Sequence, residues 1–497
     1  MRAAGMREWT VPVMTLFALC VRWAIGLGTY SGFNTPPMYG DYEAQRHWME
    51  LTLHLPMSKW YTYDLQYWGL DYPPLTAYVS WLCGLVGSWI DPSWFALDAS
   101  RGIETPSSKV YMRATVLVLD ALVYLPALFT FVRLWSGHRS QSSQHAALAM
   151  LLFQPALLLI DFGHFQYNSV MLGLVIHALN SFFLGRDLLG AVFFVGALCF
   201  KQMALYYSPA IFGYLLGRCF SLGWRDGSRL FVQLGITTAL SFVIMFAPWL
   251  WPPSALLGGP ITRIFPFSRG LFEDKVANFW CASHVVLKWR RLLAPSALMR
   301  LSTLFTAAGF APSLVLLVRA GGGRGLALLP YALFCTSMSF FLFSFQVHEK
   351  SVLLPLMPLA LAMAGDAGIA EWGTLVQNVA VFSMWPLLQR DGQGAQYIAL
   401  LGLWNYLIGY NPLRVQDSFV RLLSVASYTA IAVLHALEWL VTPPARYPDL
   451  FPVLNVLLSA GVFALAWGRG TLRLLQVSWA LGALKERESE RTSGKHE

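Results

Sequence analysis

Residues 39–50 have the sequence YGDYEAQRHWME, and residues 65–78 have the sequence LQYWGLDYPPLTAY. Both stretches are polar and aromatic, and the first contains three acids, an arginine and a histidine. Elsewhere the chain is mostly apolar: of 497 residues 56% are hydrophobic and 12% charged, whereas about 25% are charged in soluble domains. A pore or a lipid-facing helix does not need such stretches, but a site that holds a sugar and moves a proton does. The sequence therefore predicts an all-α polytopic membrane protein with its chemistry in a polar loop.

Apolar runs long enough to cross a bilayer follow one another along the chain. A membrane-spanning helix needs about 20 such residues, and the regions 73–90, 203–217, 275–290 and 370–410 are ambiguous by that rule. We expect about 11 to 14 transmembrane helices. The clear candidates begin near residues 11, 114, 146, 169, 188, 230, 302, 326, 350, 420 and 450.

Basic residues set the expected orientation. They lie before residue 8, in the loops near 133–139 and 218–229, and in the tail 485–497, and such loops stay on the cytoplasmic side. The long loop 31–112 then faces the lumen, and its residues 43–55 are predicted to form an interfacial helix. Arg22, inside the first apolar run, either snorkels to a headgroup or faces the protein interior.

Several protein classes are excluded by composition and spacing. The net charge of +9 is spread along the chain, so we expect no nucleic-acid partner. Six cysteines occur without a CxxC pair, which supports neither a zinc site nor a disulfide framework. Residues 348–350 have the sequence HEK, but the second histidine that an HExxH motif requires does not follow. This segment is therefore not a zinc-protease motif.

Asp41 is the main candidate for chemistry. It follows Gly40 where a helix begins, so it either caps that helix or acts as a general base toward a sugar hydroxyl; the two roles are compatible. With Glu43 it also forms an acid-x-acid pattern that suits a divalent metal. Side chains that are two positions apart on a helix point in opposed directions. A metal bound by both acids is therefore not favoured, and no cofactor is expected.

Two further polar groups have the composition of a sugar site. Asp71 lies between Trp68 and Tyr72, where aromatic rings can stack on a sugar and the acid can accept its hydroxyls; the alternative is a capping Asp. The second group lies at a membrane edge and is either functional or a self-satisfied polar hairpin. Its candidate sugar-binding residues are Asp161, His164 and Gln166, and the nearby Lys201 either snorkels or pairs with a phosphate.

Cationic candidates for an anionic phosphate occur later in the chain. Arg269 and Lys275 belong to a polar block whose acids Glu273 and Asp274 suit sugar hydroxyls, unless the block is an ordinary salt-bridged loop. The residues that interrupt two apolar spans, His348 and Lys350, suit a phosphate at the lipid boundary.

At these residues the chain resembles the dolichyl-phosphate-glucose glucosyltransferases of the endoplasmic reticulum. The motifs that carry the resemblance are GDYEAQRHWME from Gly40, WGLDYPP from Trp68, GHFQYN from Gly163, RGLFEDKVANFW from Arg269 and VHEKS from Val347. The resemblance implies a type C glycosyltransferase (GT-C) fold in the endoplasmic reticulum membrane with a lumenal active site. It implies inverting transfer of glucose from dolichyl phosphate glucose to the 3-hydroxyl of a terminal mannose on the dolichyl-diphosphate oligosaccharide used for N-glycosylation. The family's base maps to Asp41, and the histidine near the donor phosphate maps to His348.

The EAQRHW run favours the family branch that adds the first glucose. Alternatives are the branch that adds the second glucose, a polyprenyl-phosphate mannosyltransferase, and a non-enzymatic lipid flippase, which would show repeated halves with polar groups at mid-membrane. For domains we expect a catalytic membrane module over 1–350 that includes the loop 31–112, C-terminal transmembrane helices over 351–484, and a cytoplasmic tail over 485–497.

Overall fold

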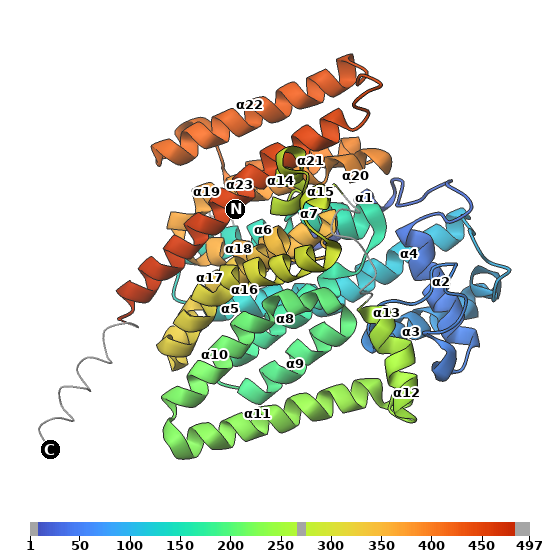
Figure 1. The fold of residues 1–497 in the computed structure, drawn as a ribbon, viewed down its shortest axis with the longest axis horizontal. Coiled ribbons are helices and arrows are strands. Elements are labelled where there is room, and N and C mark those ends of the chain that lie inside the picture. The colour runs from blue at the N-terminus through green and yellow to red at the C-terminus, as the bar shows by residue number, and fades with distance from the viewer. Residues whose placement is uncertain (1–7, 266–274, 483–497) are drawn as a thin grey trace, which may run out of the picture. The chain divides into compact units, whose positions relative to one another are not determined.

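The computed structural model describes residues 8–265 and 275–482, and within these ranges every regular element is a helix. The chain divides into two compact units, each assembled from segments that are far apart in sequence. Among the described residues, the first unit contains 8–204, 234–265 and 387–408, and the second contains 205–233, 275–386 and 409–482. Figure 1 gives the helix labels used below.

The first unit contains the polar loop and the helices that surround it. Helices α8 and α9 lie side by side, as do α2 and α3, and α5 and α8. Among its described residues, three π-helical turns interrupt the α-helical path: η3 (Asp120–Tyr124), η4 (Leu159–Phe165) and η7 (Leu257–Ile261). The α-helices of this unit are α1 (Thr10–Gly26), α2 (Asp41–His54), α3 (Pro74–Ile90), α4 (Pro106–Leu119), α5 (Leu125–Trp135), α6 (Gln141–Leu152), α7 (Pro155–Leu158), α8 (Asn168–Phe183), α9 (Asp187–Phe200), α12 (Pro253–Leu256), α13 (Thr262–Ile264) and α21 (Gly394–Ile408).

The second unit is built on a layer in which α17 packs against α16, α18, α10 and α23. Two helices continue from one unit to the other: α11 (Gly223–Phe246) and the short α20 (Trp385–Arg390). The helices of the second unit are α10 (Ser208–Ser221), α14 (Phe279–Leu287), α15 (Trp289–Leu292), α16 (Pro295–Ala320), α17 (Gly322–Phe343), α18 (Leu353–Gly365), α19 (Ala367–Ser383), α22 (Ser418–Leu440) and α23 (Leu450–Ala480).

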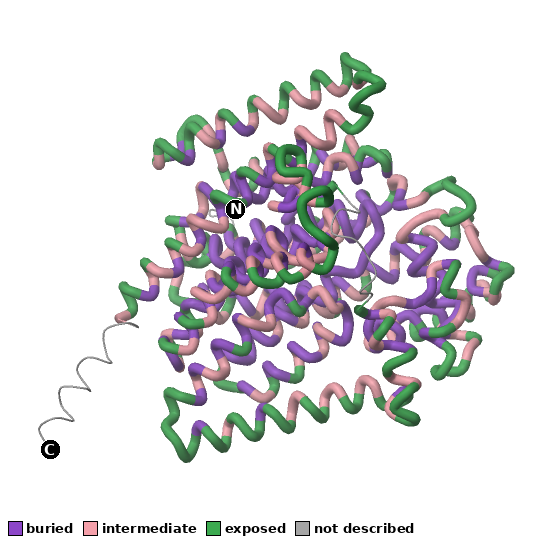
Figure 2. Tube along the Cα trace, viewed as in Figure 1, coloured by how far each residue is buried: buried purple, intermediate pink, exposed green. Residues whose placement is uncertain are grey.

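In the part of the chain that the structure describes, seven helical stretches are long and apolar enough to cross a membrane. Four shorter apolar helices of 14 to 17 residues accompany them (α1, α3, α8 and α9). In the stretch that includes α11, only 6% of the most apolar segment is buried inside the protein. Figure 2 shows this helix exposed along most of its length, as expected of a helix that faces lipid. The seven stretches are Pro106–Trp135, Gln141–Phe165, Gly223–Trp249, Pro295–Ala320, Gly322–Phe343, Ser418–Leu440 and Leu450–Ala480. The predicted multi-pass character is therefore confirmed, whereas the count of 11 to 14 spans stays a prediction.

Arg22 of α1 faces the protein interior. It is fully buried, and its Nε donates to Oδ2 of Asp120 at 2.8 Å while NH1 donates to the carbonyl of Leu152 at 3.0 Å. The snorkelling alternative is wrong, because a charge this deep needs an internal partner and here it has one.

The boundaries of α2 follow from its sequence. Gly40 allows the close approach that precedes the helix, because a Cβ there would lie 2.7 Å from the backbone of Ser31. Asp41 and Glu43 then occupy the first turn, where negative charge complements the helix dipole. The helix ends at His54, just ahead of Leu55-Pro56, since the residue before a proline disfavours helical geometry. The predicted helix 43–55 is thus confirmed to within two residues at each end.

Candidate active site

A carboxylate, an imidazole and a second carboxylate form a hydrogen-bonded relay in the first unit. Asp41 comes from the start of α2, His164 from η4, and Asp391 from the connection between α20 and α21. His164 Nε2 lies 3.0 Å from Asp41 Oδ2, and His164 Nδ1 lies 2.5 Å from Asp391 Oδ2. The imidazole and Asp391 are buried, whereas 23% of the Asp41 side chain is exposed. The relay therefore ends at an acid that an incoming molecule can reach.

Asp41 is held from two directions. Its backbone N–H donates to the hydroxyl of Ser31 at 3.2 Å, and its Oδ2 also accepts a hydrogen bond from the side-chain amide of Gln166. Gly40, not Asp41, is the cap residue of α2, and Asp41 is the first helical residue. The capping alternative for Asp41 is therefore wrong: its carboxylate turns toward His164 and Gln166 instead.

The π-helical turn η4 explains how His164 and Gln166 reach the same oxygen. In this turn the N–H of Gln166 bonds to the carbonyl of Asp161, five residues back. The wider turn shifts the side chains away from the positions of an α-helix, and such insertions are frequent at functional sites. Arg113 supports it by donating to the carbonyl of Gly163 at 2.8 Å.

A buried cation extends the network behind Gln166. Lys201 Nζ donates to the amide oxygens of Gln166 at 2.9 Å and Asn168 at 2.6 Å, and it lies 4.9 Å from the ring centre of Tyr72. Asn168 in turn donates to Asp161, which also accepts the N–H of Ser169. The snorkelling alternative for Lys201 is wrong, because its ammonium is buried among these groups.

Two hydrogen bonds flank the imidazole, and both partners are carboxylates. A neutral histidine carries a single N–H, whereas a carboxylate ion only accepts. The arrangement Asp41–His164–Asp391 therefore needs two protons distributed over three groups. A relay with this requirement can take up a proton at one end while the hydrogen bonds are kept, which is the property a general base needs.

A cavity of about 540 Å³ opens beside the relay. Its wall is formed by residues 29–33, 35, 39–40 and 390–392 and by Trp68. Gly40 in this wall precedes Asp41, and Asp391 is itself a relay residue. This volume lies within the range of about 300–1,000 Å³ that small-molecule sites have.

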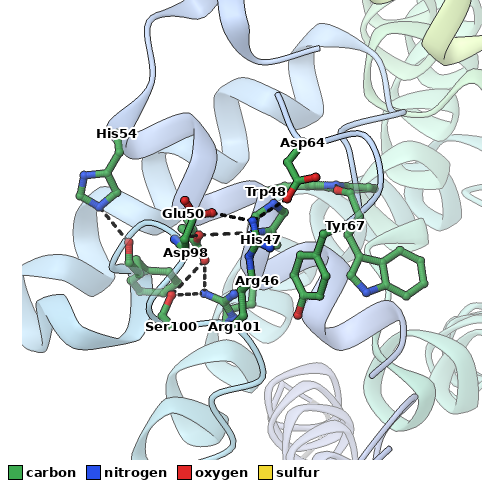
Figure 3. A network of polar contacts seen from close by, with 12 residues as sticks. Arg46, His47, Trp48, Glu50, His54, Asp64, Tyr67, Asp98, Ser100 and Arg101 are labelled. Carbon is green, nitrogen blue, oxygen red and sulfur yellow. Dashed lines mark hydrogen bonds and ion pairs between the residues drawn. The ribbon is translucent and has the colours of Figure 1, made fainter. Parts of the chain in front are cut away.

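The second acid of the acid-x-acid pattern belongs to a different cluster. Glu43 receives a two-pronged ion pair from Arg46 at 2.6 and 2.7 Å and a hydrogen bond from Tyr67 at 2.8 Å. Glu50 accepts from Arg46 at 2.7 Å and from Ser100 at 2.9 Å. Figure 3 shows the Arg46–Glu50 side of this buried cluster. Asp41 and Glu43 thus face separate partners, and among the described residues no group of three or more His, Cys, Asp and Glu side chains is placed to hold a metal ion.

Electrostatics in this cluster follow from its pairing. Burial alone would raise the pKa of Glu50, but the hydrogen bond from His47 and the positive charge of Arg46 outweigh it and hold that pKa at about 2. Burial would lower the pKa of Arg46, but its bonds with Glu43 and Glu50 raise it. Pairing therefore outweighs the effect of burial on the pKa of both Glu50 and Arg46.

Apart from Glu273 and Asp274, which lie outside the described residues, the structure places the sequence-predicted sugar residues in one neighbourhood of the first unit. Trp68 lines the cavity, and Tyr72 lies against Lys201 and packs on Trp48 with ring centres 4.8 Å apart. Asp71 lies next to Tyr72 and is half-buried. Asp161 is fully buried, with both carboxylate oxygens hydrogen-bonded inside the protein, so in this structure it positions Asn168 and Ser169. Contact of these residues with a sugar stays a prediction.

The predicted phosphate-binding residues that the structure describes, His348, Lys350 and Lys275, belong to the second unit. His348 and Lys350 lie at the start of the short helix η8 (Glu349–Val352), where the N–H of His348 donates to the hydroxyl of Ser351. Lys275 forms an ion pair with Asp449 at an exposed position. Arg269, Glu273 and Asp274 lie outside the described residues. The roles of all these residues stay predictions.

Asp391 was missed from the sequence. It lies 227 residues beyond His164 and beyond the catalytic module predicted for 1–350. The available signal was the polar stretch QRDGQ from Gln389, which interrupts the apolar region 370–410. A single acid in such a stretch is ambiguous until the fold brings it to His164.

A multi-pass helical membrane protein with a reachable carboxylate beside a sugar-sized cavity has the features of a membrane-embedded glycosyltransferase of the GT-C type. The model of the family described as "ALG6, ALG8 glycosyltransferase family" matches residues 18–469, and the chain belongs to this family. The resemblance drawn from the sequence motifs is thereby confirmed, and with it the assignment as an enzyme.

Named relatives are similar over most of their length. A Schizosaccharomyces pombe protein named "Probable dolichyl pyrophosphate Man9GlcNAc2 alpha-1,3-glucosyltransferase" is 46% identical, with 94% of this chain and 92% of that protein covered. The "Dolichyl pyrophosphate Man9GlcNAc2 alpha-1,3-glucosyltransferase" of Saccharomyces cerevisiae is 44% identical, with 93% and 90% covered. The Gallus gallus protein of the same name is 41% identical, with 90% and 93% covered.

Proposed function

We propose that this enzyme transfers glucose from dolichyl phosphate glucose to the 3-hydroxyl of a terminal mannose on the nine-mannose, dolichyl-diphosphate-linked oligosaccharide. The transfer inverts the anomeric centre and serves protein N-glycosylation, with the active site on the lumenal side of the endoplasmic reticulum membrane. The names of the relatives support the acceptor and the linkage. The observation that carries the chemistry is the relay from Asp391 through His164 to the partly exposed Asp41.

In this mechanism Asp41 accepts the proton of the acceptor hydroxyl as that oxygen attacks the anomeric carbon of glucose. The attack comes from the face opposite the phosphate, the glycosidic carbon–oxygen bond to phosphate breaks, and dolichyl phosphate leaves as a monoester with an added negative charge. His164 and Gln166 keep the carboxylate of Asp41 aimed while it takes the proton. Protein cations stabilise the charge on the leaving phosphate; His348, Lys350, Arg269 and Lys275 are the proposed groups, and no metal cofactor is required.

The test is transfer of labelled glucose from dolichyl phosphate glucose to the nine-mannose lipid acceptor by purified wild type and Asp41→Asn, with and without a chelator. Asp226→Asn is the matched control, because Asp226 is exposed on α11. We expect a loss of about 10²- to 10⁴-fold in Asp41→Asn, the usual contribution of a general base, with the control active and the chelator without effect. An active Asp41→Asn enzyme would remove the base assignment, and chelator-sensitive activity would restore a metal.

A second acceptor separates the two branches of the family. The same assay with an oligosaccharide that already carries one glucose reports second-glucose transfer. Exclusive use of the nine-mannose acceptor supports first-glucose transfer, and exclusive use of the glucosylated acceptor contradicts it.

A further inference from the structure

We propose that the cavity lined by residues 29–33, 35, 39–40, 390–392 and Trp68 is the acceptor-glycan subsite, in which terminal mannose rings bind before transfer. This inference rests on the proposed function and adds the place where the acceptor is held. The cavity, defined by the described residues of the first unit, has a volume of about 540 Å³. That is enough for part of an oligosaccharide arm by the usual size of ligand sites.

The lining has the chemistry of a sugar site. Tyr30, Phe33, Tyr39 and Trp68 supply aromatic rings, and hydroxyl side chains come from Thr29, Ser31 and Thr35. The exposed Arg390 adds a donor for ring hydroxyls. Among the described residues that line the cavity there is no Leu, Ile, Val or Met, so the lining suits a glycan better than a polyprenyl chain, which needs aliphatic surroundings.

The position of the cavity fits the acceptor. Its wall contains Gly40, the residue before the proposed base Asp41, and Asp391, which bonds to His164. A mannose held there presents its hydroxyls toward the relay. A base must reach the proton that it removes, so the sugar beside the relay is the one that loses a proton, and that is the acceptor.

The wall is preformed. Gly32 has a φ of +79°, and a Cβ there would lie 1.8 Å from the carbonyl oxygen of Tyr39, so the two arms of the loop close tightly on each other. Asn34 and Tyr30 are tied to Glu104, with the hydroxyl of Tyr30 at 3.0 Å from Oε1. On the other side, Trp68 donates to the carbonyl of Met38 at 2.5 Å. A site fixed before binding loses less freedom when the ligand enters.

Arg390 is the residue to change, because it is exposed and its replacement leaves the packed wall intact. Loss of a hydrogen bond from a charged group predicts an acceptor KM about 10- to 100-fold higher in Arg390→Ala. Because this contact is made equally before and during transfer, kcat and the donor KM should stay near wild type. Arg390→Lys should recover part of the loss. Gln389→Ala is the matched control: Gln389 is the exposed neighbour on α20 and does not line the cavity.

A binding measurement makes the test independent of turnover. The free nine-mannose oligosaccharide is titrated into wild type, Arg390→Ala and Gln389→Ala, with thermal unfolding as a check on folding. Weaker binding in Arg390→Ala alone supports the subsite. Equal binding by all three proteins, no binding by wild type, or a rise in donor KM with the acceptor KM unchanged would each overturn it. Failure of wild type to transfer glucose, with this binding pattern intact, would count against the proposed function and not against the subsite.

Discussion

Helix α2 carries two kinds of acid, and they lie in opposite surroundings. Asp41 is partly exposed and shares hydrogen bonds with His164, which a second carboxylate holds from behind. Glu43 and Glu50, about half a turn and two and a half turns further along, are buried and share Arg46 between them. In the first group one acid is reachable from outside; in the second both acids are buried and bonded to the same arginine. The first arrangement suits proton transfer and the second suits folding.

The largest effect should come from breaking the paired cluster. Arg46→Met leaves two buried carboxylates without their cation, and removal of one partner of a buried ion pair typically costs about 3–5 kcal/mol of stability. We expect a clear drop in the unfolding temperature in detergent, with transfer per folded molecule retained. Arg101→Met is the control, because the Arg101 pairs are about a third exposed and should contribute about 1 kcal/mol or less. An Arg46→Met enzyme with wild-type stability and no activity would contradict the division of roles.

Acid should weaken the same cluster. The pKa of Glu50 is about 2 in the folded protein and 4.5 ordinarily, so the unfolded chain binds a proton first as the pH falls. The contribution of Glu50 to stability is therefore complete above about pH 4.5 and is lost as the pH approaches 2. The groups that face Glu50 are Arg46, His47, Ser100 and the N–H of Asp98. The difference in unfolding temperature between wild type and Glu50→Gln should shrink across this range; a difference that grows would show the opposite shift.

Changing the relay behind the base should affect rate more than stability. Asp391→Asn keeps the shape but replaces the carboxylate that meets His164 Nδ1. Removal of a hydrogen-bonded partner one step behind a reactive group typically costs about 10- to 100-fold in activity. We expect kcat to fall by this factor and the pH–rate profile to move, which a residue with a purely structural role would not cause. Gln389→Ala should leave both unchanged, and an unaltered profile in Asp391→Asn would separate Asp391 from the chemistry.

The smallest effect on stability should come from Lys275. Its ion pair with Asp449 is 45% and 57% exposed, and such surface pairs contribute about 0–1 kcal/mol. Lys275→Met should therefore unfold near the wild-type temperature. A raised donor KM in this variant would support the proposed contact with the donor phosphate, and an unchanged donor KM would leave the lysine as a surface residue; Asp449→Asn controls for loss of the pair itself.

Much of the fold and part of the site could be predicted from sequence because they depend on local pattern. The apolar runs predicted spanning helices, and the polar block from Tyr39 to Glu50 predicted both α2 and the candidate base. Tertiary contacts decided the rest. The direction of Lys201 depends on Gln166 and Asn168, and the pairing of His164 with Asp391 joins residues that no local periodicity relates. The π-helical turn η4 has no characteristic hydrophobic pattern. His164 and Gln166 could therefore be predicted as site residues, but their contact with Asp41 could not.

The discontinuous make-up of the first unit affects how the site forms during synthesis. Asp41 and His164 enter the membrane early, but Asp391 follows Asp41 by roughly 350 residues, which takes on the order of 20–70 s at about 5–20 residues per second. During that interval the ribosome-bound chain has a base and an imidazole without the carboxylate that completes them. A chain that stops before residue 391 therefore has most of the described apolar stretches but lacks the third member of the relay, so the relay is completed only when translation is nearly over.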